Sequence, residues 1–159
     1  MEIKLNVNSN MVTGKAEAGT TLLRFLRDNG HTEVKKGCGE GECGVCTVLL
    51  DGIAVTSCLV PAMQAQGKEI TTIKKQGDPV IDALKESFVN HGAVQCGFCS
   101  PAMVLTAKWF LSENPHPTRA EIREYMAGNL CRCTGYAKIV DAIEYASKTI
   151  ESFAKIGAR

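Results

Sequence analysis

Eight cysteines in two groups of four constrain this chain of 159 residues more than any other feature of its sequence. The N-terminus, MEIKLNVNSN, has neither the basic start nor the apolar segment of a secretory signal, so we expect a cytoplasmic protein. Cytosolic thiols stay reduced, and an even, clustered set of them indicates metal binding rather than disulfides. The first group is Cys38, Cys43, Cys46 and Cys58, and the second is Cys96, Cys99, Cys131 and Cys133.

Composition excludes several other classes of protein. Charged residues make up 22% of the chain, the net charge is +1 and no block of Lys or Arg occurs, so we expect neither nucleic acid nor a membrane surface as a partner. No apolar run reaches the ~18 residues of a membrane-spanning helix. The length allows two small domains, which usually need a metal or another cross-link because they bury little core.

The N-terminal part of the sequence predicts a small α+β domain at residues 1–76. Alternating apolar residues predict strands, and Asp51-Gly52 between two β-rich runs is the pair that suits a type I′ hairpin turn. The expected elements are strands at 2–7 and from Met11, with a turn at 8–10, a helix from Thr20 or Thr21 to Gly30, a hairpin at 46–58, a short helix at 59–67 and a strand at 68–73.

The C-terminal part, residues 77–159, predicts an all-α domain of four helices. A polar linker at 74–79 separates it from the first domain. Helix-start signals occur at Asp78-Pro79, at Ser100-Pro101 and at Thr118, where Glu121 completes a capping box. The last helix is expected to follow the C-x-C pair and to carry apolar residues from Ile139 to Ile150.

The first cysteine group has the spacing C-x4-C-x2-C-x11-C, and its first three members match the spacing of plant-type [2Fe–2S] ferredoxins. Such a cluster has two irons, each of which takes two thiolates. Three thiolates can come from one loop if glycines let the backbone turn around the cluster, and Gly39, Gly41 and Gly44 lie in this loop. Structural zinc is a weaker alternative, since zinc sites seldom use this spacing.

The second group is less decisive from spacing alone. CGFC precedes one predicted helix and CRC precedes another, and thiolates are favoured at helix N-termini. Four thiolates meeting there could hold zinc or a second [2Fe–2S] cluster. A redox-active C-x2-C pair is a lesser alternative, because no βαβ unit surrounds it.

Four stretches in a fixed order carry a resemblance to a known family: KKGCGEGECGVCTVLLDG, SCL, GAVQCGFCSPAMVL and GNLCRCTGY. The chain resembles, over nearly its whole length, the small iron–sulfur subunit of the molybdenum hydroxylases, the family of xanthine dehydrogenase, aldehyde oxidoreductase and CO dehydrogenase. The resemblance implies a β-grasp, plant-type ferredoxin domain followed by a four-helix bundle domain. It also implies two [2Fe–2S] clusters, one for each group of cysteines.

The resemblance further implies partners and a direction of electron flow. Such subunits assemble with a large subunit that carries a molybdopterin cofactor and usually with a medium subunit that carries FAD, often as a dimer of heterotrimers. Electrons pass from molybdenum to the helical-domain cluster, then to the ferredoxin-like cluster, and then to FAD or another acceptor. This chain is expected to contain no substrate site and no catalytic residue of its own.

Two residues are expected, through the resemblance, to meet the molybdenum cofactor. Gln95, just before the first cysteine of CGFC, corresponds to a glutamine that hydrogen-bonds the pterin, and Cys133 corresponds to a ligand that lies against the pterin amino group. An amide that both donates and accepts suits a pterin edge. Arg132, between the last two cysteines, has two readings: a charge that favours the reduced cluster, or a residue that faces the large subunit.

Overall fold

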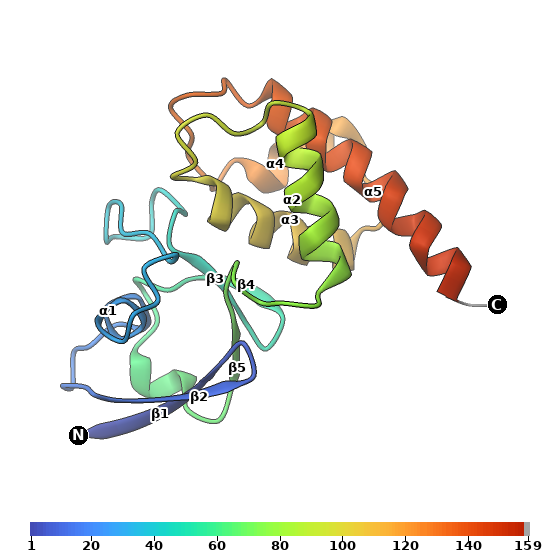
Figure 1. Cartoon of the computed structure of the whole chain (residues 1–159). Coiled ribbons are helices and arrows are strands. Elements are labelled where there is room, and N and C mark those ends of the chain that lie inside the picture. The colour runs from blue at the N-terminus through green and yellow to red at the C-terminus, as the bar shows by residue number, and fades with distance from the viewer. Residues whose placement is uncertain (158–159) are drawn as a thin grey trace.

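The computed structural model describes the backbone of residues 1–157 and the side chains of residues 1–150. Residues 158–159, the end of the predicted helical domain, lie outside this described part. The fold is α+β, with a five-stranded mixed sheet at the N-terminal end of the chain and four of its five α-helices at the C-terminal end (Figure 1). We call residues 2–71 the sheet half and residues 79–157 the helical half.

The sheet has the strand order β2-β1-β5-β3-β4. Strand β1 pairs with β2 in antiparallel fashion and with β5 in parallel fashion, while β3 is antiparallel to both β5 and β4. The last strand in sequence therefore lies in the centre of the sheet and joins the two hairpins. The strands are β1 (Glu2–Val7), β2 (Asn10–Lys15), β3 (Thr47–Leu50), β4 (Ile53–Thr56) and β5 (Glu69–Thr71).

The local sequence explains both hairpins. In β1 the alternate residues Ile3, Leu5 and Val7 are buried, as the period-two pattern predicts. The β3–β4 turn has φ of 50° at Asp51 and 84° at Gly52, which are the left-handed values of a type I′ turn. The first turn is tighter than the three residues predicted from sequence: Asn8 and Ser9 both have positive φ, and β2 begins at Asn10.

One helix and one 3-10 turn cover the core face of the sheet half. Helix α1 (Leu22–Asp28) begins where Thr21 accepts a hydrogen bond from the backbone N–H of Arg24. The helix predicted at 59–67 is shorter than expected, a single 3-10 turn η1 (Ala62–Ala65). Buried residues of both pack against the inward residues of β1, β3 and β5.

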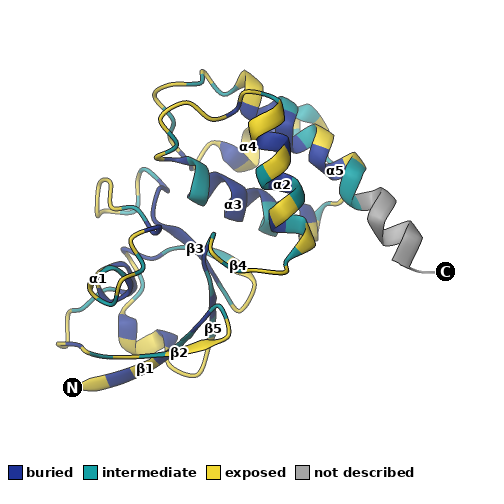
Figure 2. Cartoon of the chain, viewed as in Figure 1, coloured by how far each residue is buried: buried dark blue, intermediate teal, exposed yellow. Residues whose placement is uncertain are grey.

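The helical half consists of α2 (Pro79–Asn90), α3 (Ser100–Glu113), α4 (Arg119–Met126) and α5 (Ala137–Gly157). Asp78 caps α2, and the predicted capping box of Thr118 and Glu121 opens α4. Helix α2 contacts α3 and α5, and α4 also contacts both α3 and α5. Helix α3 is the most enclosed of the four, with eight buried residues among its fourteen, as its colouring in Figure 2 shows.

The two halves share one continuous packed boundary. Helix α3 contacts β3 and β4, and Leu49 of β3 is a buried member of the same hydrophobic cluster as the four helices. Ala54 of β4 and Ile73, which follows β5, pack against that cluster as well. The arrangement fixes the helical half on the sheet half near the cysteine-rich loop (Figure 1).

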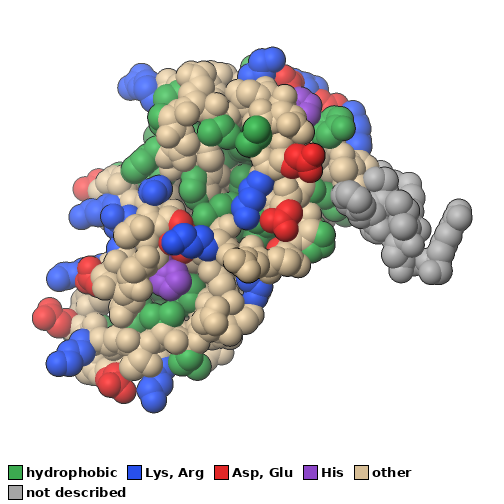
Figure 3. All heavy atoms as spheres, viewed as in Figure 1, with side chains coloured by type: hydrophobic (Ala, Val, Ile, Leu, Met, Phe, Trp, Pro, Cys, Tyr) green, Lys and Arg blue, Asp and Glu red, His purple; other side chains and the backbone are tan. Residues whose placement is uncertain are grey.

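In the described residues, none of the helices combines the length and the apolar character needed to cross a bilayer. On the face drawn in Figure 3, acidic and basic side chains are interspersed, with hydrophobic side chains reaching the surface over both halves.

Candidate metal centres

The first cysteine group is assembled by a loop and a hairpin. Cys38 and Cys43 lie in the loop between α1 and β3, Cys46 directly precedes β3, and Cys58 follows β4. Because Thr47 pairs with Thr56 across the hairpin, the residues just beyond them come together. The Ser57 hydroxyl secures this end by donating to the Cys46 carbonyl oxygen over 2.7 Å. We call these four cysteines the first site.

Within the first site the thiols lie as two pairs with different surroundings. Cys38 and Cys43 are on the outside, where the backbone N–H groups of Glu40 and Cys43 each donate to Cys38 Sγ over 3.4 Å. These N–H groups lower the pKa of Cys38 to about 7. Cys46 and Cys58 are buried and interact with each other, and burial followed by this contact raises the pKa of Cys58 to about 11.

Glycine is required in this loop where the backbone has a positive φ or where another group lies too close for a Cβ atom. Gly44 has a φ of 66°, and a Cβ there would lie 2.3 Å from the carbonyl oxygen of Gly128. Gly41 has a φ of 84°, and a Cβ there would lie 2.5 Å from Leu59 Cδ1. Gly39 also has positive φ but faces open space. The loop therefore wraps tightly and presents backbone N–H groups to the sulfurs.

The second cysteine group lies between helices of the other half, and we call it the second site. Cys96 and Cys133 are exposed, with their sulfurs 3.5 Å apart. Cys99 is buried and interacts with Cys131; burial first, and this contact second, raise the pKa of Cys99 to about 12. The second site thus repeats the pattern of the first, with one outer and one inner pair.

The prediction that both second-site pairs directly precede helices is right only for CGFC. Cys99 is the residue immediately before α3, but α5 begins at Ala137, four residues after Cys133. Gly135 and Tyr136 both have positive φ, which turns the chain before the helix can start. The helix dipole of α5 therefore favours the thiolate form of Cys133 less than expected, because the effect of a helix dipole fades within one turn.

Two residues that contact Cys131, the inner thiol of the CRC pair, were not predicted from the sequence. The Thr134 hydroxyl donates to Cys131 Sγ over 3.2 Å, and the backbone N–H of Cys131 donates to the Tyr136 hydroxyl oxygen over 2.8 Å. Burial alone would raise the pKa of Cys131, but hydrogen bonds from Thr134 and from backbone N–H groups outweigh it and lower that pKa. The signal available in the sequence was the TGY that follows CRC.

The paired arrangement fits a two-iron cluster. A [2Fe–2S] cluster takes two thiolates at each iron. Among the described residues, no three Cys, His, Asp or Glu side chains gather as ligands of one ion. Two thiol pairs at each site, with hydrogen-bond donors turned toward the sulfurs, suit a group that takes two thiolates at each of its two ends.

The remaining predicted residues are at the surface of the second site. Gln95 and Arg132 are both exposed, as are the neighbouring Cys96 and Cys133. Phe98, between the cysteines of CGFC, is 48% exposed although it is a large apolar residue. The outer edge of the second site is therefore open to a partner.

Two hydrogen bonds join the loops that carry the two sites, one from a backbone N–H and one from a side-chain amide. The N–H of Leu130, next to Cys131, donates to the carbonyl oxygen of Cys43 over 3.0 Å. Asn129, which is 4% exposed, donates through its side-chain amide to the carbonyl oxygen of Gly44, also over 3.0 Å. The loop that carries CRC thus rests directly on the loop of the first site.

Two family models match the chain in tandem. A "2Fe-2S iron-sulfur cluster binding domain" matches residues 5–71, and a "[2Fe-2S] binding domain" matches residues 70–144. The first range contains the first site, and the second range contains the second site.

Curated relatives match nearly end to end. The chain is 48% identical to the nicotinate dehydrogenase small FeS subunit of Eubacterium barkeri, over 91% of this chain and 93% of that protein. It is 42% identical to the xanthine dehydrogenase iron-sulfur-binding subunit of Escherichia coli O157:H7, over 92% and 94%.

Solved structures also match the chain over nearly its whole length. The quinoline 2-oxidoreductase structure from Pseudomonas putida 86 superimposes with a TM-score of 0.88 and 42% identity, over 96% of both chains. In the aldehyde oxidoreductase of Desulfovibrio desulfuricans, with a TM-score of 0.86 and 37% identity, the match covers 95% of this chain but 17% of that one. The chain belongs to the family of small [2Fe–2S] iron–sulfur subunits of the molybdenum hydroxylases, which serve these oxidoreductases in electron transfer and not in catalysis.

Proposed function

We propose that this chain carries two [2Fe–2S] clusters and relays electrons from a molybdopterin centre on a large subunit to FAD on a medium subunit or to another acceptor. Cys38, Cys43, Cys46 and Cys58 would hold one cluster, in a β-grasp domain at residues 1–76. Cys96, Cys99, Cys131 and Cys133 would hold the other, in a four-helix bundle domain at residues 77–159. The clusters supply one-electron redox chemistry.

The observation that carries this proposal is the contact between the two sites. From Cys131 the backbone runs to Leu130, whose N–H bonds the carbonyl oxygen of Cys43. Ligands of both candidate clusters are thereby joined by a short path of covalent bonds and a single hydrogen bond. A scaffold that only needed two structural metals would not require them to be neighbours across a domain boundary.

The second site is the proposed entry point. Its outer pair, Cys96 and Cys133, is exposed, and Gln95 and Phe98 lie beside it at the surface. The Gln95 amide can both donate to and accept from a pterin edge, and the Phe98 ring offers apolar area for a protein interface. We place the molybdopterin-bearing subunit here.

The first site is the proposed exit. Cys38 and Cys58 border a surface groove of about 580 Å³, whose charged lining is mixed: it includes Arg24, Arg27 and Lys36 as well as Asp28 and Glu40, and Arg24 pairs with Asp28. Arg27 donates hydrogen bonds to the carbonyl oxygens of Thr32 and Val34. We place the FAD-bearing subunit or another acceptor against this groove, because the exposed Cys38 brings the first site to the surface here.

Metal analysis of the anaerobically purified protein tests the proposal. Two clusters predict about four irons and four acid-labile sulfides per chain, because each cluster contains two of each. Two irons with one zinc would contradict it and would indicate a single cluster beside a structural metal. Co-purification with a molybdenum-containing large subunit, in a cytoplasmic complex with the mass of a dimer of heterotrimers, tests the partners; a chain that purifies alone would instead indicate a free-standing ferredoxin.

A further inference from the structure

The residues that follow CRC form a closed ring of hydrogen bonds around Cys131. The Thr134 hydroxyl donates to Cys131 Sγ over 3.2 Å. The backbone N–H of Tyr136 donates to Thr134 Oγ1 over 3.2 Å. The backbone N–H of Cys131 donates to the Tyr136 hydroxyl oxygen over 2.8 Å. Because Thr134 Oγ1 already accepts from Tyr136, its single hydrogen is free to point at the sulfur.

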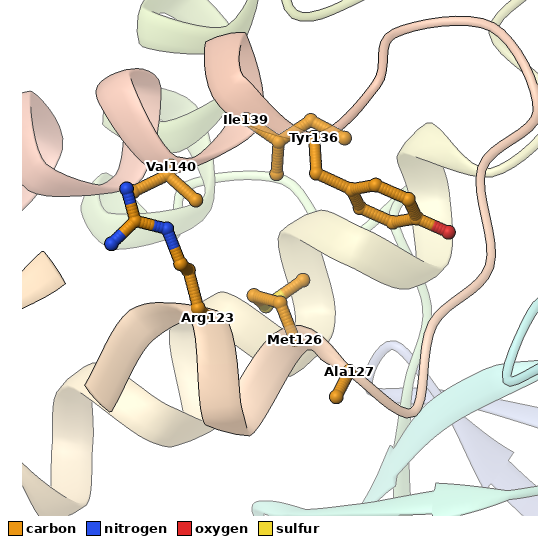
Figure 4. A pocket seen from close by; sticks show the side chains of 6 residues that line it. All are labelled: Arg123, Met126, Ala127, Tyr136, Ile139 and Val140. Atoms are coloured by element: carbon orange, nitrogen blue, oxygen red, sulfur yellow. The ribbon is translucent and has the colours of Figure 1, made fainter. Parts of the chain in front are cut away.

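The tertiary structure holds this ring in place. Tyr136 has a φ of 69°, an unfavourable value for a residue with a bulky side chain. Its side chain helps to line an apolar cavity of about 400 Å³ between α4 and α5, with Met126 and Ile139 among the other lining residues. In Figure 4 its hydroxyl points away from the other labelled side chains, toward the loop that contains Cys131. The strained backbone persists because packing on two helices determines it.

We propose that Thr134 is a positioning residue that sets the reduction potential of the second site through its hydroxyl bond to the sulfur of Cys131. This inference rests on the proposed function, in which Cys131 ligates a [2Fe–2S] cluster. Reduction adds one electron, and part of that negative charge lies on the ligating sulfurs. A hydroxyl that points at the sulfur stabilises the reduced state more than the oxidised one, and it keeps its own proton.

The hydroxyl bond can be removed by substitution, unlike the hydrogen bonds of the first site. There, Cys38 Sγ receives hydrogen bonds from the backbone N–H groups of Glu40 and Cys43, which every residue except proline provides. The first cluster can therefore serve as an internal reference in the same molecule. A change confined to the second cluster would come from the Thr134 hydroxyl, while a general disturbance of the fold would move both.

The test is a redox titration of the purified, fully loaded protein, followed by EPR, for wild type, Thr134→Val and Thr134→Ser. Dithionite supplies the electrons. In Thr134→Val the equilibrium constant for reducing the second cluster should fall about threefold to tenfold, since only the difference in strength of the hydrogen bond between the reduced and the oxidised state affects it. For one electron this is a potential lower by about 30–60 mV. Thr134→Ser keeps the hydroxyl, so the potential of its second cluster should equal that of the wild type. The potential of the first cluster should be the same in all three proteins.

Several outcomes would overturn the proposal. One is an unchanged potential in Thr134→Val with both clusters present; another is an equal shift in Thr134→Ser. If Thr134→Val does not retain the second cluster, pulsed EPR of the wild-type protein in D₂O decides, because a bonded hydroxyl must appear as a rapidly exchanging deuteron coupled to that cluster. A wild-type protein with no iron at the second site would refute the proposed function itself, and metal analysis distinguishes that result.

Discussion

Gly44 lies in the loop that carries Cys38 and Cys43, and it is the residue at which this loop meets the helical half. Its φ of 66° strains any other residue, and a Cβ would lie 2.3 Å from the Gly128 oxygen and 2.9 Å from Asn129 Nδ2. Gly44→Ala should therefore destabilise the protein through both backbone strain and a steric clash, which costs about 1–3 kcal/mol in packed sites. The measurement is the thermal unfolding midpoint, together with the iron content.

Gly39 provides the matched control for this prediction. It lies in the same loop with a φ of 79°, but nothing lies within 4 Å of an added Cβ. Gly39→Ala should cost only the backbone strain, about 1–2 kcal/mol. Equal unfolding midpoints for the two variants would show that the contact of Gly44 with the helical half contributes nothing.

At the scale of elements, the start of α2 depends on one carboxylate with two roles. Asp78 accepts from the N–H groups of Val80 and Ile81, and it pairs with Lys108 of α3 over 2.6 Å. Burial alone would raise the pKa of Asp78, but the Lys108 pair and these two hydrogen bonds outweigh it and hold that pKa below its ordinary value of 3.8. Asp78 therefore both caps α2 and attaches it to α3.

The lowered pKa makes this contribution to stability depend on pH. It is fully present above the unfolded-state pKa of Asp, about 3.9, and is lost as the pH falls through the lower folded-state value. Asp78→Asn keeps a capping oxygen but loses the charge, so it should lower the unfolding midpoint at pH 7, and its difference from wild type should shrink below about pH 4. Asp82→Asn is the control, since the Asp82–Lys85 pair is exposed and worth little. A difference for Asp78→Asn that stays constant with pH would contradict the assignment.

At the scale of the whole molecule, Asn129 links the sheet half and the helical half through a hydrogen bond. It is buried, and its amide donates across the boundary between the halves to the Gly44 carbonyl oxygen, which also accepts from the N–H and the hydroxyl of Thr47. Asn129→Ala removes one of the three donors to that carbonyl oxygen, which should lower the free energy of unfolding by about 0.5–1.5 kcal/mol. Because the same boundary carries the bond between Leu130 and Cys43, the magnetic interaction between the two proposed clusters, when both are reduced, should also weaken.

Thermal unfolding and the splitting of the EPR signals measure these two effects of Asn129→Ala. Asn90→Ala, on the exposed side of the α2 C-terminus, is a suitable control, because Asn90 does not face this boundary. An unfolding midpoint equal to that of the control would show that the Asn129 hydrogen bond contributes nothing to holding the two halves together.

Much of the architecture was predicted from the sequence because it depends on neighbours along the chain. Alternating apolar residues identified the strands, Asp51-Gly52 identified the hairpin turn, and Asp78 and Thr118 identified helix starts. The spacing of the first cysteine group predicted [2Fe–2S] chemistry, and the family resemblance extended it to the second group, in agreement with the matching family models. Helix boundaries were less accurate where the backbone is strained, as at Tyr136 before α5.

What the sequence by itself determined is therefore the set of elements, the two groups of cysteines and the family. Only the tertiary structure decided how the thiols pair, that Leu130 bonds Cys43, and that Thr134 and Tyr136 enclose Cys131. The physical reason is the range of the interactions. Caps, turns and alternation act within a few residues, whereas Cys96 and Cys133, or Gly44 and Asn129, meet only when helices pack on a sheet and bring distant segments together.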